Sequence, residues 1–319
     1  MAHLTGNTTA FIESEQYSSF ILEQLKDGLL PTVFYRDVSD FQTGETLHIK
    51  TIGRASLQEV TENVPLVYNA IDTGEVTLTI TDYVGDAWFV TDKLRQDGAQ
   101  IDQLMAARAA DATRAIQENF ETTWLASLNA SQTVANANDV NGFAHRIVAT
   151  GGPPPAPTLE LEDLINMRLA FDKANVPTGG RVAIVDPVVA ATLNTKFQGT
   201  YNVDSNQTMQ NILEGGFARD HQFVMEIFGW NIMTSNRLPV IADETIGIQV
   251  TNGIANVFMS IADDHHKPGM VAWRQQPRVE SERNKDLQRD EFVDTARWGV
   301  GPQRVDTLGI ILTSSTAIA

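Results

Sequence analysis

Residues 97–129 form a long stretch without helix breakers, and they constrain the fold more than any other part of the chain. Apolar residues recur every three or four positions, and neither Gly nor Pro occurs between Ala99 and Leu128. This spacing predicts an amphipathic helix, with Asp97 as its N-cap. At 1.5 Å per residue it would be about 45 Å long. We expect it to brace a large, flat subunit. An ordinary core helix, or two helices with a bend near Ala109, is the alternative.

The first 40 residues contain one short predicted helix, from Glu13 to Asp27, followed by Gly28 as a C-cap. Its apolar residues are Phe20, Ile21, Leu22 and Leu25. A single short helix preceded by polar residues cannot form a core, so we expect this arm to lie on something else.

Residues 45–84 contain two strand-like segments separated by turn residues. The second alternates three apolar residues, Val76, Leu78 and Ile80, with threonines. Two strands alone are marginally stable in water, so a projecting hairpin indicates a partner surface. Membership of an internal sheet is the alternative.

The second half of the chain predicts a compact α/β unit and a separate polar ribbon. A helix, a Gly turn, the apolar strand 181–185 and the helix start Asp186-Pro187 follow in order. Residues 272–302 predict the ribbon, with its tip near 284–287. Six basic and six acidic side chains balance between Ala272 and Val300, and such a ribbon has little to bury within its own chain.

Composition and motifs exclude several function classes. No phosphate loop, nucleophile elbow, dinucleotide fingerprint or zinc-protease spacing occurs, so we predict no enzyme and no cofactor. Residues 263–266, Asp-Asp-His-His, come nearest to a metal site, but adjacent side chains point apart, and we interpret them as a solvated loop. The chain has no cysteine, which rules out thiol catalysis, and a net charge of −17. That charge opposes broad binding to nucleic-acid phosphates. No window is apolar enough to span a bilayer.

Short segments along nearly the whole chain then carry a resemblance. They are 90–94 (Val-Thr-Asp-Lys-Leu), 176–177 to 186–187, 228–232 (Phe-Gly-Trp-Asn-Ile) with 235–239, and 297–300 with 308–313. In this order the chain resembles the major capsid (coat) proteins of tailed double-stranded-DNA bacteriophages, which share the Hong Kong 97 fold.

The resemblance implies an α+β, Hong Kong 97-like fold. It begins with an N-terminal arm at 1–40 and an extended β loop (a β-hairpin) at 41–84. A peripheral domain follows at 85–180, which contains the spine helix 97–129 and is completed by the β ribbon 272–302. An axial α/β domain at 181–271 is completed by the C-terminal strand 303–319. Some members crosslink subunits through a loop lysine. Here Lys50 lies near the loop base, so crosslinking is not carried over.

The resemblance also implies function and partners. The protein would self-assemble, as hexamers and pentamers, into the icosahedral head enclosing the phage genome. Its location would be the virion, after assembly in the host cytoplasm, without a membrane. Partners would be a separate scaffolding protein, since the chain begins directly with its arm, a portal and an optional decoration protein. Packaged DNA would be contacted weakly and non-specifically, because the subunit is acidic.

Six residues are candidate contacts between subunits. We expect Val76, Leu78 and Ile80 to be covered by a neighbour. We expect Arg283, Lys285 and Arg289 to form charge pairs across subunits. The alternatives to a capsid are an encapsulin-like nanocompartment shell, a phage tail or decoration protein, and an enzyme whose site is scattered across loops.

Overall fold

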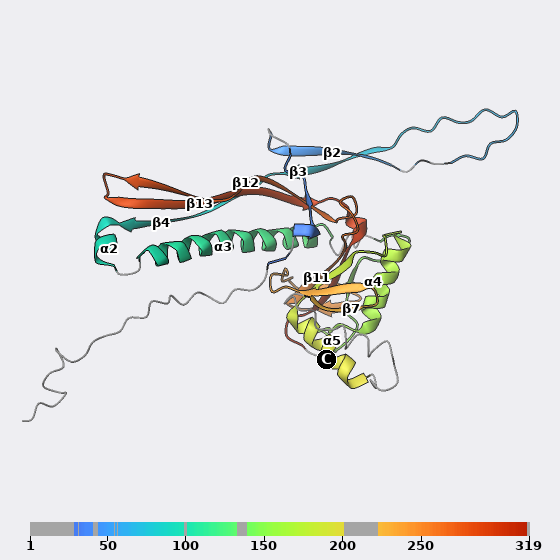
Figure 1. The fold of residues 1–319 in the computed structure, drawn as a ribbon. Coiled ribbons are helices and arrows are strands. Elements are labelled where there is room, and N and C mark those ends of the chain that lie inside the picture. Colours follow the sequence, from blue (N-terminus) through green and yellow to red (C-terminus); the bar gives the residue numbers. More distant parts are fainter. Residues whose placement is uncertain are drawn as a thin grey trace, which may run out of the picture.

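The computed structural model describes residues 29–30, 32–40, 44–53, 55, 57–98, 101–132, 139–200 and 223–317. The predicted arm helix and a further predicted helix near 207–213 lie outside the described residues. The rest forms an elongated body around one long helix, a projecting hairpin, and a second body around a six-stranded sheet (Figure 1).

The predicted long helix is one helix, α3 (Ile101–Ala130), so the alternative of two helices is wrong. It begins later than predicted, because a separate short helix, α2 (Asp92–Asp97), precedes it. The Thr91 side chain accepts a hydrogen bond from the Leu94 amide as the N-cap of α2. The expectation that Asp97 caps the long helix is therefore wrong, since Asp97 is the last residue of α2.

A four-stranded sheet lies along α3, in the order β1-β12-β13-β4 (Figure 1). Its strands are β1 (Arg36–Asp37), β12 (Gly269–Asn284), β13 (Arg289–Pro302) and β4 (Asp82–Thr91). The antiparallel pair β12 and β13 is the predicted ribbon, with its tip at 285–288. The sequence did not predict β4, which pairs with β13 from Thr91 to Asp82.

The expectation that the ribbon buries little within its own chain is wrong for the face toward α3. The Phe120 ring centroid lies 4.6 Å from that of Trp273 and 5.8 Å from that of Trp298. Farther along, the Thr113 hydroxyl donates to the fully buried Asp294 carboxylate at 2.9 Å. The balanced charges lie mostly on the other face and at the tip, so the ribbon is one layer of a helix-on-sheet core.

The predicted hairpin is present as β2 (Thr46–Ile52) and β3 (Thr73–Thr79), paired antiparallel from Thr46–Thr79 to Ile52–Thr73. Leu78 and Ile80, however, are each 1% exposed and pack against Met270 and Ala272. These two side chains anchor the hairpin base to its own subunit. The expectation that a neighbour covers them is therefore wrong, and of the three predicted contacts Val76, Leu78 and Ile80 only Val76 stays partly exposed.

The second body is built on a sheet in the order β5-β14-β11-β6-β8-β7. The strands are β5 (Arg146–Val148), β14 (Leu308–Ser314), β11 (Gly253–Ser260), β6 (Arg181–Val185), β8 (Trp230–Thr234) and β7 (Phe223–Ile227). Helices α4 (Leu161–Lys173) and α5 (Pro187–Thr200) accompany it, with the small pair β9 (Glu244–Ile246) and β10 (Ile248–Val250). Two short 3-10 turns, η2 (Thr32–Phe34) and η4 (Val305–Thr307), complete the part of the chain that the structure describes.

Both faces of this sheet are covered, which is typical of central strands with continuous apolar sequence. In β6, Ala183 and Val185 share a cluster with α4 and α5. Val182 and Ile184 share the other cluster with the C-terminal half of α3. The long helix thus belongs to both bodies. Residues 139–180, predicted to belong with the helix, supply β5 and α4 to the second body instead.

Candidate interaction surfaces

The loop between β2 and β3, residues 53–72, exposes a concentration of apolar side chains. Eight large apolar residues here and at the adjoining strand end are each at least 54% exposed: Ile52, Leu57, Val60, Val64, Leu66, Val67, Tyr68 and Ile71. Scattered exposed apolar residues are normal, but so many of them within one loop are typical of a surface that binds a partner. In Figure 1 the loop extends well away from both bodies.

Polar contacts hold the two sides of this loop together. The Gln58 side chain donates to the Val67 carbonyl at 2.6 Å and accepts from the Val67 amide at 3.1 Å. At the base, the Gly53 amide donates to the Asp72 carbonyl at 2.8 Å. The apolar side chains are therefore presented on a paired loop.

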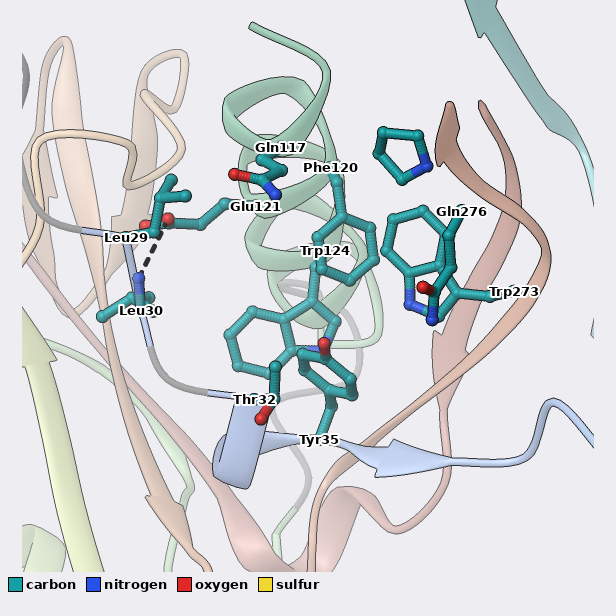
Figure 2. Close-up of a pocket in the computed structure, with 11 residues that line it drawn as sticks. Leu29, Leu30, Thr32, Tyr35, Gln117, Phe120, Glu121, Trp124, Trp273 and Gln276 are labelled. Carbon is teal, nitrogen blue, oxygen red and sulfur yellow. Dashed lines mark hydrogen bonds between the residues drawn. The ribbon is translucent and has the colours of Figure 1, made fainter. Parts of the chain in front are cut away.

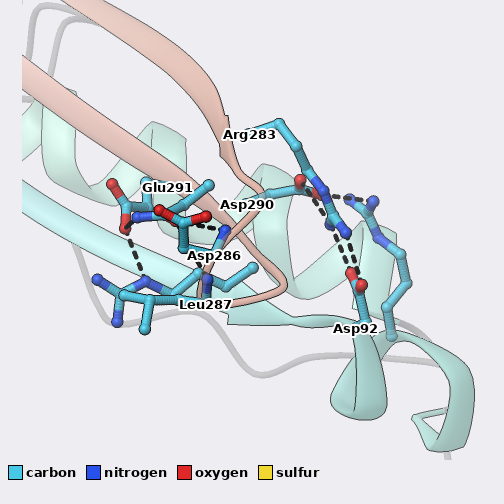
Figure 3. A network of polar contacts seen from close by, with 9 residues as sticks. Asp92, Arg283, Asp286, Leu287, Asp290 and Glu291 are labelled. Carbon is cyan, nitrogen blue, oxygen red and sulfur yellow. Dashed lines mark hydrogen bonds and ion pairs between the residues drawn. The ribbon is translucent and has the colours of Figure 1, made fainter.

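The ribbon tip carries a network of ion pairs within one chain (Figure 3). Arg283 contacts the Asp92 carboxylate with both terminal nitrogens, at 2.5 and 2.6 Å, and Asp290 at 3.1 Å. Arg95 reaches the other oxygen of Asp290 at 2.5 Å. The predicted contact Arg283 thus ties the tip to α2, which the sequence did not indicate.

Arg289 is also engaged within its own chain. Its Nε donates to Glu291 at 2.7 Å, and its guanidinium lies 4.4 Å from the Phe89 ring centroid. The Arg289 side chain lowers the pKa of Glu291, and Arg283 lowers the pKa of Asp92. Lys285, the remaining predicted contact, is exposed at the turn itself.

A cavity of about 410 Å³ opens beside α3, between the helix, β12 and the segment before β1 (Figure 2). Its lining is largely apolar and aromatic: Leu29, Leu30, Thr32, Tyr35, Gln117, Phe120, Glu121, Trp124, Trp273, Gln276 and Pro277. Burial raises the pKa of Tyr35. The sequence did not predict this cavity, because its walls come from three distant segments.

Glu121 closes one end of the cavity, and it is a buried charged residue that the sequence did not single out. It is 5% exposed. Its carboxylate accepts from the Leu30 amide at 3.2 Å and from the Ser235 hydroxyl at 3.1 Å, and Arg237 lies 3.9 Å away. A signal existed, since Glu121 precedes two fully buried leucines, Leu125 and Leu128, by four and seven positions.

The segment 263–266 has a structural explanation. The Asp263 carboxylate accepts from the amides of His265 and His266 at 2.9 and 3.0 Å, and from the His266 ring. These are the contacts of an Asx turn. Among the described residues no group of three or more His, Asp or Glu could hold a metal ion, and no described helix is long and apolar enough to cross a membrane.

Comparisons with known proteins place this architecture. The family model described as phage capsid protein matches residues 74–313. Among solved structures, the capsid of the cyanophage P-SCSP1u has a TM-score of 0.74 at 16% identity, covering 98% of this chain and 96% of that one. The mature capsid of bacteriophage PhiM1 has a TM-score of 0.72 at 13% identity, with coverages of 98% and 96%. The capsid of Ralstonia phage GP4 has 0.67 at 10% identity, covering 96% of each. No curated protein matches.

Proposed function

The chain belongs to the phage capsid protein family, and from this premise we propose how its copies join into a shell. The family assigns it a structural role in the capsid of the virion, so the predicted family, fold and non-enzymatic function are confirmed. We propose that the copies assemble as hexamers and pentamers into an icosahedral head enclosing double-stranded DNA.

The observation that carries this proposal is the exposed apolar loop 53–72. Full burial of one such side chain is worth about 1.5–3 kcal/mol, and the loop presents several far from its own core. A second copy of the chain is the proposed partner, because a contact repeated around symmetry axes closes a shell. Val76 and Lys285 stay as proposed contact residues beside it.

The roles of the separate parts of the chain, and its partners, are proposals. We propose that residues 1–40 act as an arm, 41–84 as the extended loop, and 303–319 as the strand completing the axial domain. We propose a separate scaffolding protein, a portal and an optional decoration protein as partners, and assembly in the host cytoplasm. The net charge of −17 supports weak, non-specific contact with the packaged DNA.

The test is a pair of loop variants matched in position. Leu66→Ser with Tyr68→Ser removes apolar surface, whereas Glu59→Gln with Glu62→Gln leaves it in place. Co-expressed with the scaffolding protein, the first variant should yield subunits without particles, and the second should yield particles like the parent. Sedimentation and negative-stain microscopy measure both. Normal particles from the Leu66/Tyr68 variant would remove the loop from the proposal.

No observation on the described residues favours the alternatives. An encapsulin-like shell would enclose an enzyme as cargo, and microscopy of purified particles separates it from a head filled with DNA. A tail or decoration protein does not fit the family match. The same micrographs would show tubes, or no particles, in that case.

A further inference from the structure

The cavity of Figure 2 lies beside Leu29 and Leu30, the first residues of the chain that the structure describes. Leu29 and Leu30, which belong to the predicted arm and come directly after its predicted helix and Gly28, form one of its walls. We propose that the apolar residues of the arm, Phe20, Ile21, Leu22 and Leu25, dock into this cavity within the same chain.

The cavity walls are apolar enough to bind an apolar side chain. Phe120 and Trp124 line it from α3, and Trp273 on β12 packs against Phe120, so the surfaces are mainly aromatic (Figure 2). A volume of about 410 Å³ has room for more than one side chain. The arm supplies four large apolar residues within six positions, and a single short helix has no core of its own in which to bury them.

The path of the chain makes the same subunit the nearest source. The Glu121 carboxylate accepts a hydrogen bond from the Leu30 amide at 3.2 Å, which holds this part of the arm at the cavity wall. Residues 20–25 precede Leu29 by four to nine positions. In a helix they lie about 6–14 Å from it, and in extended chain up to about 32 Å, so they reach the cavity in either case.

Charge does not oppose this docking. The segment 1–28 carries Glu13, Glu15, Glu23 and Asp27 against one base, Lys26. The exposed rim of the cavity is uncharged, with Thr32, Gln117 and Gln276. Among the described residues that line the cavity, Glu121 alone is charged, and its carboxylate is buried and accepts hydrogen bonds from the Leu30 amide and the Ser235 hydroxyl. An acidic arm with an apolar face therefore meets no exposed like charge at the mouth.

Disulfide trapping tests the proposal directly, because the chain has no cysteine of its own. Leu25→Cys is combined with Gln117→Cys at the rim, and the full-length subunit is treated with a mild oxidant before assembly. The matched control combines Glu23→Cys with Gln117→Cys, since the arm is predicted to dock as the helix Glu13–Asp27, in which positions 23 and 25 lie on opposite faces. We expect an intramolecular disulfide in the Leu25 variant, formed at least ten times faster than in the control.

The contrary results are distinct. Equal rates in the two variants, or no disulfide, would overturn the docking. A disulfide formed only between two chains, visible as a dimer on a non-reducing gel, would overturn docking within one chain and place the arm on a neighbour. Because free subunits are used, the outcome is independent of whether the loop 53–72 drives assembly.

Tryptophan fluorescence gives a second reading without cysteines. Ile21→Ser with Leu25→Ser should expose Trp273 to water, so the emission should shift to the red and acrylamide quenching should increase. Glu23→Ser, on the other face, should match the parent. Identical spectra for all three proteins would count against docking, provided that circular dichroism shows each of them folded.

Discussion

Arg146 shows how one buried charge joins distant parts of the chain. It is 3% exposed on β5. Its Nε and Nη2 donate to both oxygens of Glu244, at 2.6 and 2.7 Å, and its Nη1 donates to Asn129 at 2.9 Å. These contacts connect the second sheet, the β9 strand and the last turn of α3. A buried ion pair of this geometry is costly to break, because the partner left behind has no water to replace the lost contacts.

Glu244→Ala should lower the free energy of unfolding by about 3–5 kcal/mol, since it leaves the Arg146 guanidinium buried without its carboxylate. Glu75→Ala is the matched control. It removes an acid that also pairs with a base, Lys50, but on the exposed hairpin, and its effect should be far smaller. Urea titrations followed by circular dichroism measure both. Equal losses in the two variants would contradict the structural difference between the pairs.

Asp92 provides a test of the ribbon tip by titration. Its pKa is lowered, chiefly by the hydrogen bond from Arg283. Because the pKa is lower in the folded state, the contact stabilises the fold at pH values above the pKa of an unfolded aspartate, about 3.9. This stabilisation is lost as the pH falls through the pKa of Asp92 in the folded state. A ¹³C NMR titration of the Asp92 carboxyl should therefore give a midpoint below that of an ordinary aspartate. Arg283→Gln should raise it, whereas Arg278→Gln, which removes a base paired with Glu280, should leave it unchanged.

The hairpin behaves as two parts with different roles. Its base, with Leu78 and Ile80, is core of its own subunit, and its loop, 53–72, is exposed. The alternation of Val76, Leu78 and Ile80 correctly predicted a one-sided strand. It could not predict which surface covers the strand, because period-two alternation is the same against β12 of one chain or against a neighbour.

Leu78→Ala should therefore destabilise the subunit itself, by about 2–5 kcal/mol, as expected for a leucine that leaves a cavity in a core. Leu66→Ala, in the exposed loop, should change the free energy of unfolding by less than about 0.5 kcal/mol. Denaturant unfolding of unassembled subunits measures the two values. If Leu78→Ala unfolds at the same denaturant concentration as the parent, the hairpin base is not part of the subunit core.

At the scale of the whole molecule, shape and charge act in opposite directions on assembly. The subunit is elongated, with an exposed apolar loop that favours contact between copies (Figure 1). Every copy also carries a net charge of −17, so copies repel one another. The ion pairs of Arg283 and Arg289 are made within the chain, so they do not offset that repulsion.

Raising the salt concentration from about 50 to 500 mM should therefore increase particle yield at a fixed protein concentration, because salt screens repulsion between exposed charges but not apolar contact. Sedimentation of subunits mixed with the scaffolding protein measures the yield. The Leu66→Ser/Tyr68→Ser variant should gain little from salt, since it lacks the apolar contact. A yield that falls with salt would mean that charge pairs between subunits hold the shell together.

The sequence alone determined the features that depend on neighbours along the chain. The three-to-four-residue spacing from Ile101 to Leu128 is sufficient for the long helix, because helix hydrogen bonds and side-chain faces are local. The alternation near Val76 and the turn residues at 284–287 determined the hairpin and the ribbon in the same way. The order of these elements was enough to indicate the family.

Only the tertiary structure decided which surfaces meet. β4 pairs with β13 across some 200 residues of sequence, Arg283 selects Asp92, and Glu121 binds Leu30 and Ser235 from two other segments. Gly309 on β14 shows the same limit, since a Cβ there would lie 2.4 Å from the Met167 sulfur of α4. Such contacts depend on packing between elements that are far apart in the chain. Many residues would satisfy the same local sequence pattern, and only the shape of the folded core determines which of them make contact.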